Sequence, residues 1–484
     1  MENKTKNKTK NKTKNKQWET MLIIVSMTFM STLDGSIVNV ALPVMTKALA
    51  VTNAQIQFVS TSYLIVIAGI ILIFGNLGDR IGKSKIFLFG IFLFTFGSFL
   101  CGLAHSFPFL IFARVVQGIG SAATMANSQG IVTETVSPQE RGKALGIVGT
   151  AVALGSLVGP GLGGLIVGAA SWEYIFWINV PIGAIVFFTG LKILPESVKK
   201  QETGEKKTLD VAGSLTFLVA IVSLFISLNA GLELGFTNPL ILCGFVIAAV
   251  GMVVFLVLEK RAKNPLVDLT MFTNKLFSLS IFCGFISFMA LFCHNIILPF
   301  FLQDVREYSP GISGLILMTY PLLLSVAAPV SGHLSDKVGS EKLTFAGLLL
   351  ISLGLFCMST LNEHSPVLLL LLFIAIMAIG NGLFQSPNNS LVMSTVPRSK
   401  LGIAGSINSL IRNVGMVCGI ALSTTILYGT MSSELGYRVT DYVAGKNDVF
   451  VYGMRVVYIT AGCICLVGAA LTFWRMVTVP KEDW

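Results

Sequence analysis

Two charged residues stand inside stretches of sequence that are otherwise free of charge. Asp34 interrupts an apolar run over residues 20–46, and Arg114 separates the charge-free runs 86–113 and 115–133. A charged side chain at the centre of a membrane helix costs about 2.5 to 3.5 kcal/mol on insertion scales, so such residues usually carry function. An acid and a base in this setting can bind and release a proton, or the acid can bind a cationic compound.

The elements that must position these residues are membrane helices. Of the 484 residues, 54% are hydrophobic and 12% are charged, against about 45 to 50% and 25% in soluble domains. Thirteen runs of eighteen residues or more lack Asp, Glu, Lys and Arg, and the run around Asp34 is a fourteenth. Because about 20 apolar residues cross a bilayer as a helix, the sequence excludes a soluble enzyme and predicts fourteen transmembrane helices.

The positive charges predict the orientation. The net charge is +10, but 27 of the 34 Lys and Arg residues fall in the N-terminal tail or on the same side as it. This excess is the positive-inside pattern. We therefore expect a multi-pass protein of a plasma membrane, bacterial in origin, with both termini cytoplasmic, in contact with lipids and not with nucleic acid.

The chain also repeats itself at a period near 257. The segment 75–85 contains Gly, Leu, Asp, a base and Gly that recur in register over 332–342. Other residues recur at offsets of 256 and 262: Gly146, Gly149, Gly159 and Gly163 as Gly402, Gly405, Gly415 and Gly419, and Gly118, Gly120 and Asn127 as Gly380, Gly382 and Asn389. Secondary transporters use such repeats to place a site between two halves.

Two spans are left over between the repeats, so the predicted organisation has five parts. These are a disordered basic cytoplasmic tail (1–19), a six-helix half (20–192), a linker with two extra transmembrane helices (193–264), a second six-helix half (265–475) and a cytoplasmic tail (476–484).

Four motifs together resemble signatures of the major facilitator superfamily. They are the loop at 75–85, the run Arg-Val-Val-Gln-Gly-Ile-Gly at 114–120, the glycine-rich segment at 146–164 and the segment Leu-Asp-Gly-Ser-Ile-Val-Asn-Val-Ala-Leu-Pro at 33–43. The third is similar to a signature of the antiporters, and the fourth resembles one of the 14-span drug/proton antiporters. The resemblance implies an all-α membrane protein, with two six-helix halves and two inserted helices.

The resemblance also implies a function. We expect a proton-coupled antiporter that exports small amphipathic or cationic compounds by alternating access, as in multidrug efflux, and that works as a monomer without a cofactor. A narrow-specificity exporter or importer is the first alternative. A multi-span receptor or membrane enzyme is disfavoured, because no nucleophile, metal or paired-carboxylate constellation is apparent. No phosphate-binding loop is present either, since Leu77 stands where its first glycine is needed.

Asp34 and Arg114 are the candidates for proton coupling. Their predicted depths match, so the two side chains are expected to meet. In one interpretation Asp34 binds a proton or a cationic substrate, and Arg114 tunes its proton affinity. In the other they form a static buried pair that fixes helix packing.

The resemblance assigns a conformational latch to Asp79, Arg80, Glu134 and Asp336. In the family the acid lies at the start of a helix in the other half, and the base pairs with an acid at the foot of the fourth span, here Glu134. A charged turn is the alternative. Gly155, Gly159 and Gly163 share one helical stripe, and Pro160 bends the helix, which predicts either close packing or a rocking surface between the halves.

Polar residues on the expected cavity helices are candidates for substrate contact, although many will be hydrogen bonds between helices. They are Asn39, Tyr63, Gln117, Asn127, His294, Tyr320, Gln385, Asn388, Asn389 and Arg412. Arg412 is equally compatible with a structural pair and with a role in the site, and His294 is more typical of a satisfied core histidine. Spans ten and thirteen contain no acid before Asp336.

Overall fold

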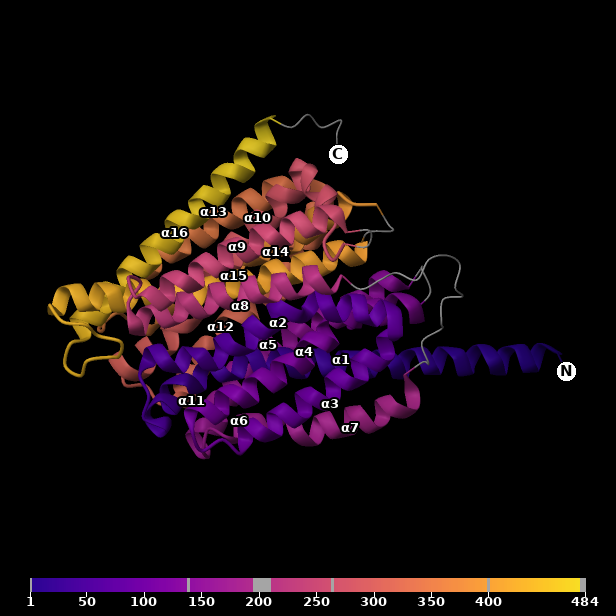
Figure 1. Cartoon of the computed structure of the whole chain (residues 1–484), viewed down its shortest axis with the longest axis horizontal. Helices are drawn as coiled ribbons and strands as arrows, with labels where there is room; N and C mark the ends of the chain where they lie inside the picture. Colours follow the sequence, from indigo (N-terminus) through magenta and orange to yellow (C-terminus); the bar gives the residue numbers. More distant parts are fainter. Residues whose placement is uncertain (1, 137–139, 195–209, 263–264, 398–400, 479–484) are drawn as a thin grey trace.

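The computed structural model describes residues 2–136, 140–194, 210–262, 265–397 and 401–478, and they form a bundle of helices (Figure 1). Within these ranges fourteen spans are long and apolar enough to cross a membrane, as the charge-free runs predict. In chain order the helices are α1 (Glu2–Leu49), α2 (Asn53–Ile81), α3 (Lys83–Gly102), α4 (Phe107–Thr135), α5 (Arg141–Ala169), α6 (Tyr174–Trp177), α7 (Asn179–Ile193), α8 (Val211–Leu234), α9 (Pro239–Arg261), η1 (Leu269–Thr273), α10 (Lys275–Phe300), η2 (Phe301–Val305), α11 (Pro310–Leu317), α12 (Thr319–Val338), α13 (Ser340–Met358), α14 (Val367–Ser394), α15 (Leu401–Leu435) and α16 (Asn447–Thr478).

Three spans consist of two helical pieces each. The sixth is α6 with α7, the ninth is α10 with η2, and the tenth is α11 with α12. The first helix extends back to Glu2, so the expected disordered tail is helical in the structure. Elongation of an existing helix adds one hydrogen bond for each residue fixed, which favours continuation of α1 beyond its apolar part.

An even number of crossings returns the chain to the side on which it starts. We call the end with both termini the terminal end and the opposite end the distal end. In Figure 1 the labels of α10, α13, α14, α15 and α16 lie above those of the first half (α1 to α7), whereas α11 and α12 are labelled beside the helices of the first half. Helix α8 contacts α2 of the first half and α15 of the second, while α9 packs mainly on α8.

The internal repeat is visible in the turns. Gly82 and Gly339, which are 257 residues apart, have φ values of 111° and 95° and separate consecutive spans. Side chains other than glycine rarely adopt such values. Each glycine therefore allows a sharp turn after the Asp-base dipeptide of its repeat.

The register of the repeat changes after the third span. Gly120 approaches the carbonyl oxygen of Gly90, and Gly380 approaches that of Gly347 in the same way. These equivalent contacts give an offset of 260 for α4 and α14, because the connection before α14 is longer than the one before α4. The offset of 262 that Gly118, Gly120 and Asn127 suggested is therefore wrong as a structural equivalence for this span.

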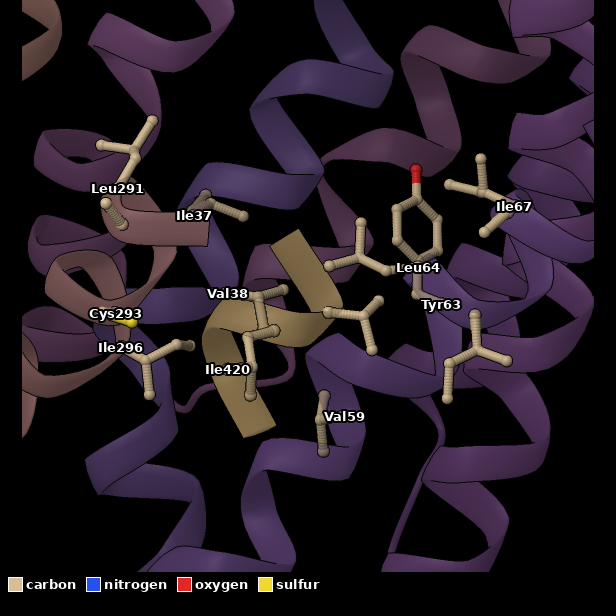
Figure 2. Packing of buried hydrophobic residues seen from close by; sticks show 14 of the residues in the cluster. Ile37, Val38, Val59, Tyr63, Leu64, Ile67, Leu291, Cys293, Ile296 and Ile420 are labelled. Carbon is tan, nitrogen blue, oxygen red and sulfur yellow. The ribbon is translucent and has the colours of Figure 1, made fainter. Parts of the chain in front are cut away.

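Buried apolar side chains join the two halves. Figure 2 shows Val38 of α1 and Val59 of α2 beside Ile296 of α10 and Ile420 of α15, all of them buried. Because four helices from both halves contribute, this layer packs the two halves against each other at that depth.

Polar contacts between the halves gather at the distal end. Lys47 Nζ lies 3.4 Å from an oxygen of Asp304. Gln303 Nε2 donates to the carbonyl oxygen of Val40 at 2.9 Å. The backbone N–H of Ala54 donates to the carbonyl oxygen of Thr440 at 3.1 Å. The distal end is therefore closed in this structure.

Candidate functional site

Asp34 and Arg114 form a buried ion pair inside the first half. A terminal nitrogen of Arg114 lies 2.6 Å from Oδ2 of Asp34. The exposed fraction of the side chain is 0% for Asp34 and 1% for Arg114. Helix α1 supplies the acid and α4 the base. The structure thus brings together the two residues for which the sequence predicts matching depths.

Two neutral amides complete the surroundings of the carboxylate. The Gln117 Nε2 group donates to Oδ1 of Asp34 at 2.8 Å, and the Asn179 Nδ2 group donates to the same oxygen at 3.0 Å. Gln117 Nε2 also lies 2.8 Å from the hydroxyl oxygen of Ser98. Asp34 therefore ties α1 to α4 and α7, and its charge is compensated by hydrogen bonds as well as by Arg114.

Arg114 has further partners that do not depend on Asp34. Its Nε donates to the carbonyl oxygen of Val59 at 2.9 Å, and another nitrogen bonds Oε1 of Gln117. Its guanidinium lies 4.2 Å from the centre of the Tyr63 ring, a cation–π distance. A change in the charge of Asp34 would therefore leave the cation with partners.

Tyr63 links this pair to a chain of hydroxyl groups. Its hydroxyl lies 2.7 Å from that of Ser121 and 3.2 Å from that of Ser31. The hydroxyls of Ser31 and Ser121 are 2.7 Å apart. Hydroxyl groups both donate and accept, so such a cluster can transmit a change in hydrogen bonding.

The second half has a related cluster without the ion pair. The structural offsets place Ser287, Tyr320 and Asn381 at the positions of Ser31, Tyr63 and Ser121. The Ser287 hydroxyl donates to Oδ1 of Asn381 at 3.2 Å, and Tyr320 lies beside Asn381. The counterpart of Arg114 is the buried Ile374, not Ile376 as the offset of 262 indicated. The ionic site is therefore a feature of one half.

His294 belongs to this second cluster. Its Nδ1 lies 3.2 Å from the hydroxyl of Tyr458, and its ring centre lies 6.3 Å from that of Tyr320. The side chain is 1% exposed. This environment is that of a hydrogen-bonded core histidine.

The charged turn at the terminal end differs from the predicted latch. Glu134 pairs with Lys83 at 2.5 Å, and Asp79 pairs with the same amine at 2.8 Å, whereas the prediction paired Glu134 with Arg80. The turn at Gly82 places Lys83 at the start of α3, beside the end of α4. The side chain of Asp336 lies outside the described residues.

The glycine stripe of α5 packs within the first half. A Cβ atom at Gly155 would lie 2.8 Å from the carbonyl oxygen of Phe29, and one at Gly163 would lie 2.7 Å from the side chain of Ile37, both on α1. Gly159 likewise faces Ser36. Of the two alternatives, these contacts agree with close packing, because the spacing of four keeps all three residues on the α1 side and not between the halves.

The opposite face of α5, around Pro160, meets the other half. A Cβ atom at Gly164 would lie 2.4 Å from the carbonyl oxygen of Pro310, and one at Gly314 would lie 2.4 Å from that of Pro160. Gly161 faces Met318. Helices α5 and α11 are therefore in backbone contact near the distal end.

The remaining cavity candidates fall into two groups. Asn127 donates to Phe74 and Asn388 donates to Ser280, both to backbone carbonyl oxygens within their own half. Asn39 accepts from Ser60 at 3.4 Å. Asn389 is exposed and pairs with Asn408, while Gln385 and Arg412 are only partly buried. Asn389, Gln385 and Arg412, which are exposed or partly buried, are thus more accessible than Asn127 and Asn388, which are buried.

Several partners were missed from the sequence. They include Asn179, Ser98, Ser31 and Ser121 around the ion pair, and Lys83 at the charged turn. Neutral polar residues are frequent in membrane helices, so Asn179 and Ser98 do not stand out. No cluster of His, Cys, Asp and Glu within the described ranges has the arrangement of a metal site.

A family model described as Major Facilitator Superfamily matches residues 24–270 and 280–484. The chain belongs to the major facilitator superfamily and is a transporter, not an enzyme. It is 32% identical over 469 residues to the riboflavin transporter RibZ of Clostridioides difficile, covering 96% of this chain and 99% of that protein. It is 34% identical over 408 residues to the multidrug resistance protein Stp of Mycobacterium tuberculosis, covering 84% and 75%.

Solved structures show the same fold at low sequence identity. The xylose transporter XylE from E. coli, in a partially occluded inward-open conformation, matches with a TM-score of 0.62 at 14% identity, over 96% of this chain and 100% of that one. A bacterial homologue of the human lysosomal transporter Spinster, in an inward-facing conformation, matches with a TM-score of 0.66 at 14% identity, over 95% and 96%.

Proposed function

We propose that this transporter couples the entry of protons to the export of small amphipathic compounds across a bacterial plasma membrane, with both termini in the cytoplasm. The observation that carries the proposal is the ion pair of Asp34 with Arg114, buried inside a transmembrane bundle. An acid in a membrane helix is costly and usually functional. An inward-moving proton supplies about 2.3 kcal/mol for each 100 mV of membrane potential, in addition to the pH term.

Proton binding at Asp34 would act on the helices that the carboxylate holds together. Protonation removes the negative charge and weakens the ties from α1 to α4 and α7. Arg114 keeps Val59, Gln117 and the Tyr63 ring as partners. The cost of leaving the cation buried is thereby reduced, so the pair can open without unfolding the half.

The substrate range is the second part of the proposal. The match to Stp supports multidrug export and antibiotic resistance, whereas the match to RibZ over nearly the full length of both chains supports a narrower transporter of a compound such as a flavin. We take amphipathic compounds as the class that includes both. Because the proton site lies within one half, we place substrate contact at the interface between the halves.

The test uses protein reconstituted in vesicles with an imposed pH gradient. We expect Asp34→Asn to abolish accumulation of ethidium or riboflavin against a gradient but to retain exchange of substrate between equal concentrations, which needs no proton movement. Asp448→Asn, which changes an exposed acid, is the control and should accumulate substrate normally. Accumulation by Asp34→Asn at the unmodified level would disprove the assignment.

A further inference from the structure

Three arginines within the transmembrane spans of α4, α15 and α16 are not exposed, and two of them form ion pairs with acids of their own half. Arg114 binds Asp34, as described above. Arg475 lies 3.3 Å from Glu341 and also bonds the hydroxyls of Ser280 and Thr344, at 3.2 and 3.0 Å. Each of these cations is therefore neutralised inside its own half.

The third arginine, Arg412 of α15, is different. No ion pair within the described part of the chain includes it, and its Nε is buried without a hydrogen-bond partner there. The Nε of Arg475 also lacks a hydrogen bond, but it lies 3.3 Å from the carboxylate of Glu341, whereas Arg412 has no such acid among the described residues. A buried donor left without an acceptor costs about 1 to 3 kcal/mol, and more when the group is charged. The arrangement is costly unless a partner arrives that is not part of the protein.

The position of Arg412 shows where that partner would lie. Residues spaced by four and seven share a face of a helix, so Arg412 shares a face with Asn408 and Gly405. A Cβ atom at Gly405 would lie 3.0 Å from Oε1 of Gln129 on α4, in the other half. This face of α15 is therefore turned toward the interface between the halves.

The depth of Arg412 agrees with a substrate site. It lies nine residues inside the span that begins at Ile403, which corresponds to about 14 Å at the rise of an α-helix. Sites of secondary transporters lie near the middle of the membrane at the interface between repeats. Spans ten and thirteen carry no acid that would neutralise the arginine at this depth.

We propose that Arg412 binds an anionic or carbonyl-rich group of the transported compound and so determines its class. The unpartnered Nε and a neighbouring terminal nitrogen form the edge of the guanidinium that binds two oxygens side by side, as in carboxylate and phosphate recognition. A permanent dication would meet an uncompensated positive charge at this point. The inference rests on the proposed export function and narrows its substrates.

The test is equilibrium binding to purified full-length protein, which needs no pH gradient. The probes are flavin mononucleotide, riboflavin and ethidium, because the two flavins share a carbonyl-rich ring and differ by a phosphate, and ethidium is a planar cation. We expect Arg412→Gln to weaken the binding of flavin mononucleotide by about tenfold or more, to weaken that of riboflavin less, and to leave that of ethidium unchanged or stronger. Arg412→Lys keeps the charge without the planar edge, so its affinity for flavin mononucleotide should lie between that of the unmodified protein and that of Arg412→Gln.

Arg455→Gln is the matched control, since it removes an exposed arginine from α16, and it should bind all three probes normally. Melting temperatures of all variants verify folding. The inference is overturned if the unmodified protein binds neither flavin, or if Arg412→Gln weakens ethidium as much as the flavins. Intact flavin binding without proton-driven accumulation would instead count against the proton coupling and leave the role of Arg412 standing.

Discussion

Asp34 accepts hydrogen bonds from side chains on two other helices, and these bonds differ in what they contribute. Arg114 supplies charge, while Gln117 and Asn179 supply neutral N–H groups. A carboxylate in the membrane needs both, because a charge partner at one oxygen leaves the other oxygen unsatisfied. Asn179 is thus a positioning residue that holds α7 against the acid.

Replacement of Asn179 tests this role. Asn179→Ala removes one donor from a buried carboxylate, so we expect a loss of about 1 to 3 kcal/mol in stability, seen as a lower melting temperature in detergent. Asn413→Ala is the control, because Asn413 is equally buried but bonds only the backbone oxygen of Ser409 on its own helix. Equal decreases for the two variants would show that Asn179 does not act through Asp34.

The ion pair could be predicted from the sequence, but its surroundings could not. Charge is rare in a membrane span, so Asp34 and Arg114 stand out, and helix rise predicts that they lie at the same depth. Asn179 is one of many neutral polar residues, and its role depends on the rotation of α7. Likewise, the choice of Lys83 over Arg80 depends on the turn at Gly82, which hydrophobicity does not report.

At the scale of elements, α5 has two faces of small residues, and each face contacts a different helix. One packs on α1 within the first half, and the other meets α11 across the interface. The sequence predicts the first face because its glycines recur at a spacing of four. It does not reveal which neighbour each face meets, since the spacing describes a single helix.

The crossing of α5 and α11 predicts a conformational effect. Gly164→Ala would place a methyl group 2.4 Å from the carbonyl oxygen of Pro310, so the helices must separate and the distal end should open. Spin labels at the exposed positions 50 and 437, one in each half, measure this in protein that lacks the eight native cysteines. We expect a longer mean distance than in the unmodified protein.

Gly168→Ala is the control for this experiment. It lies one turn further along α5, where the nearest atom, the backbone nitrogen of Gly311, would be 3.8 Å from the new methyl group, an ordinary contact. Its distance distribution should match that of the unmodified protein. If the distance distribution of Gly164→Ala also matched that of the unmodified protein, the crossing of α5 and α11 would not be what holds the distal end closed.

At the scale of the whole molecule, the distal closure joins the two halves through a loop. Asp441 accepts from the backbone N–H of Asn53 at 3.4 Å and lies near Lys47. Burial raises the pKa of the Asp441 carboxyl, and this outweighs the opposite effects of the backbone N–H groups and of Lys47. The closed state thus holds a proton on Asp441 more readily than an open state in which the loop is solvated.

The closed state should therefore depend on pH. The favourable contribution is complete below the ordinary aspartate pKa of about 3.9 and is lost as the pH rises through the raised value. With the same spin labels we expect the closed population to fall as the pH rises from the ordinary aspartate pKa through the raised pKa of Asp441. Asp441→Asn should remove this contribution to the pH dependence. Asp448→Asn changes an exposed acid nearby and should retain it. An unaltered pH profile in Asp441→Asn would assign the effect to other groups.

The two inserted spans make the molecule different on its two flanks. On one flank α8 lies against α2 and α15 and so covers the seam between the halves, while α5 and α11 form the seam on the other flank without such a cover. Many residues of α9, among them Leu240 and Val253, present large exposed apolar side chains to the surrounding lipid. Among the described helices, the two seams between the halves are consequently unequal, because α8 and α9 lie between the lipid and one seam only.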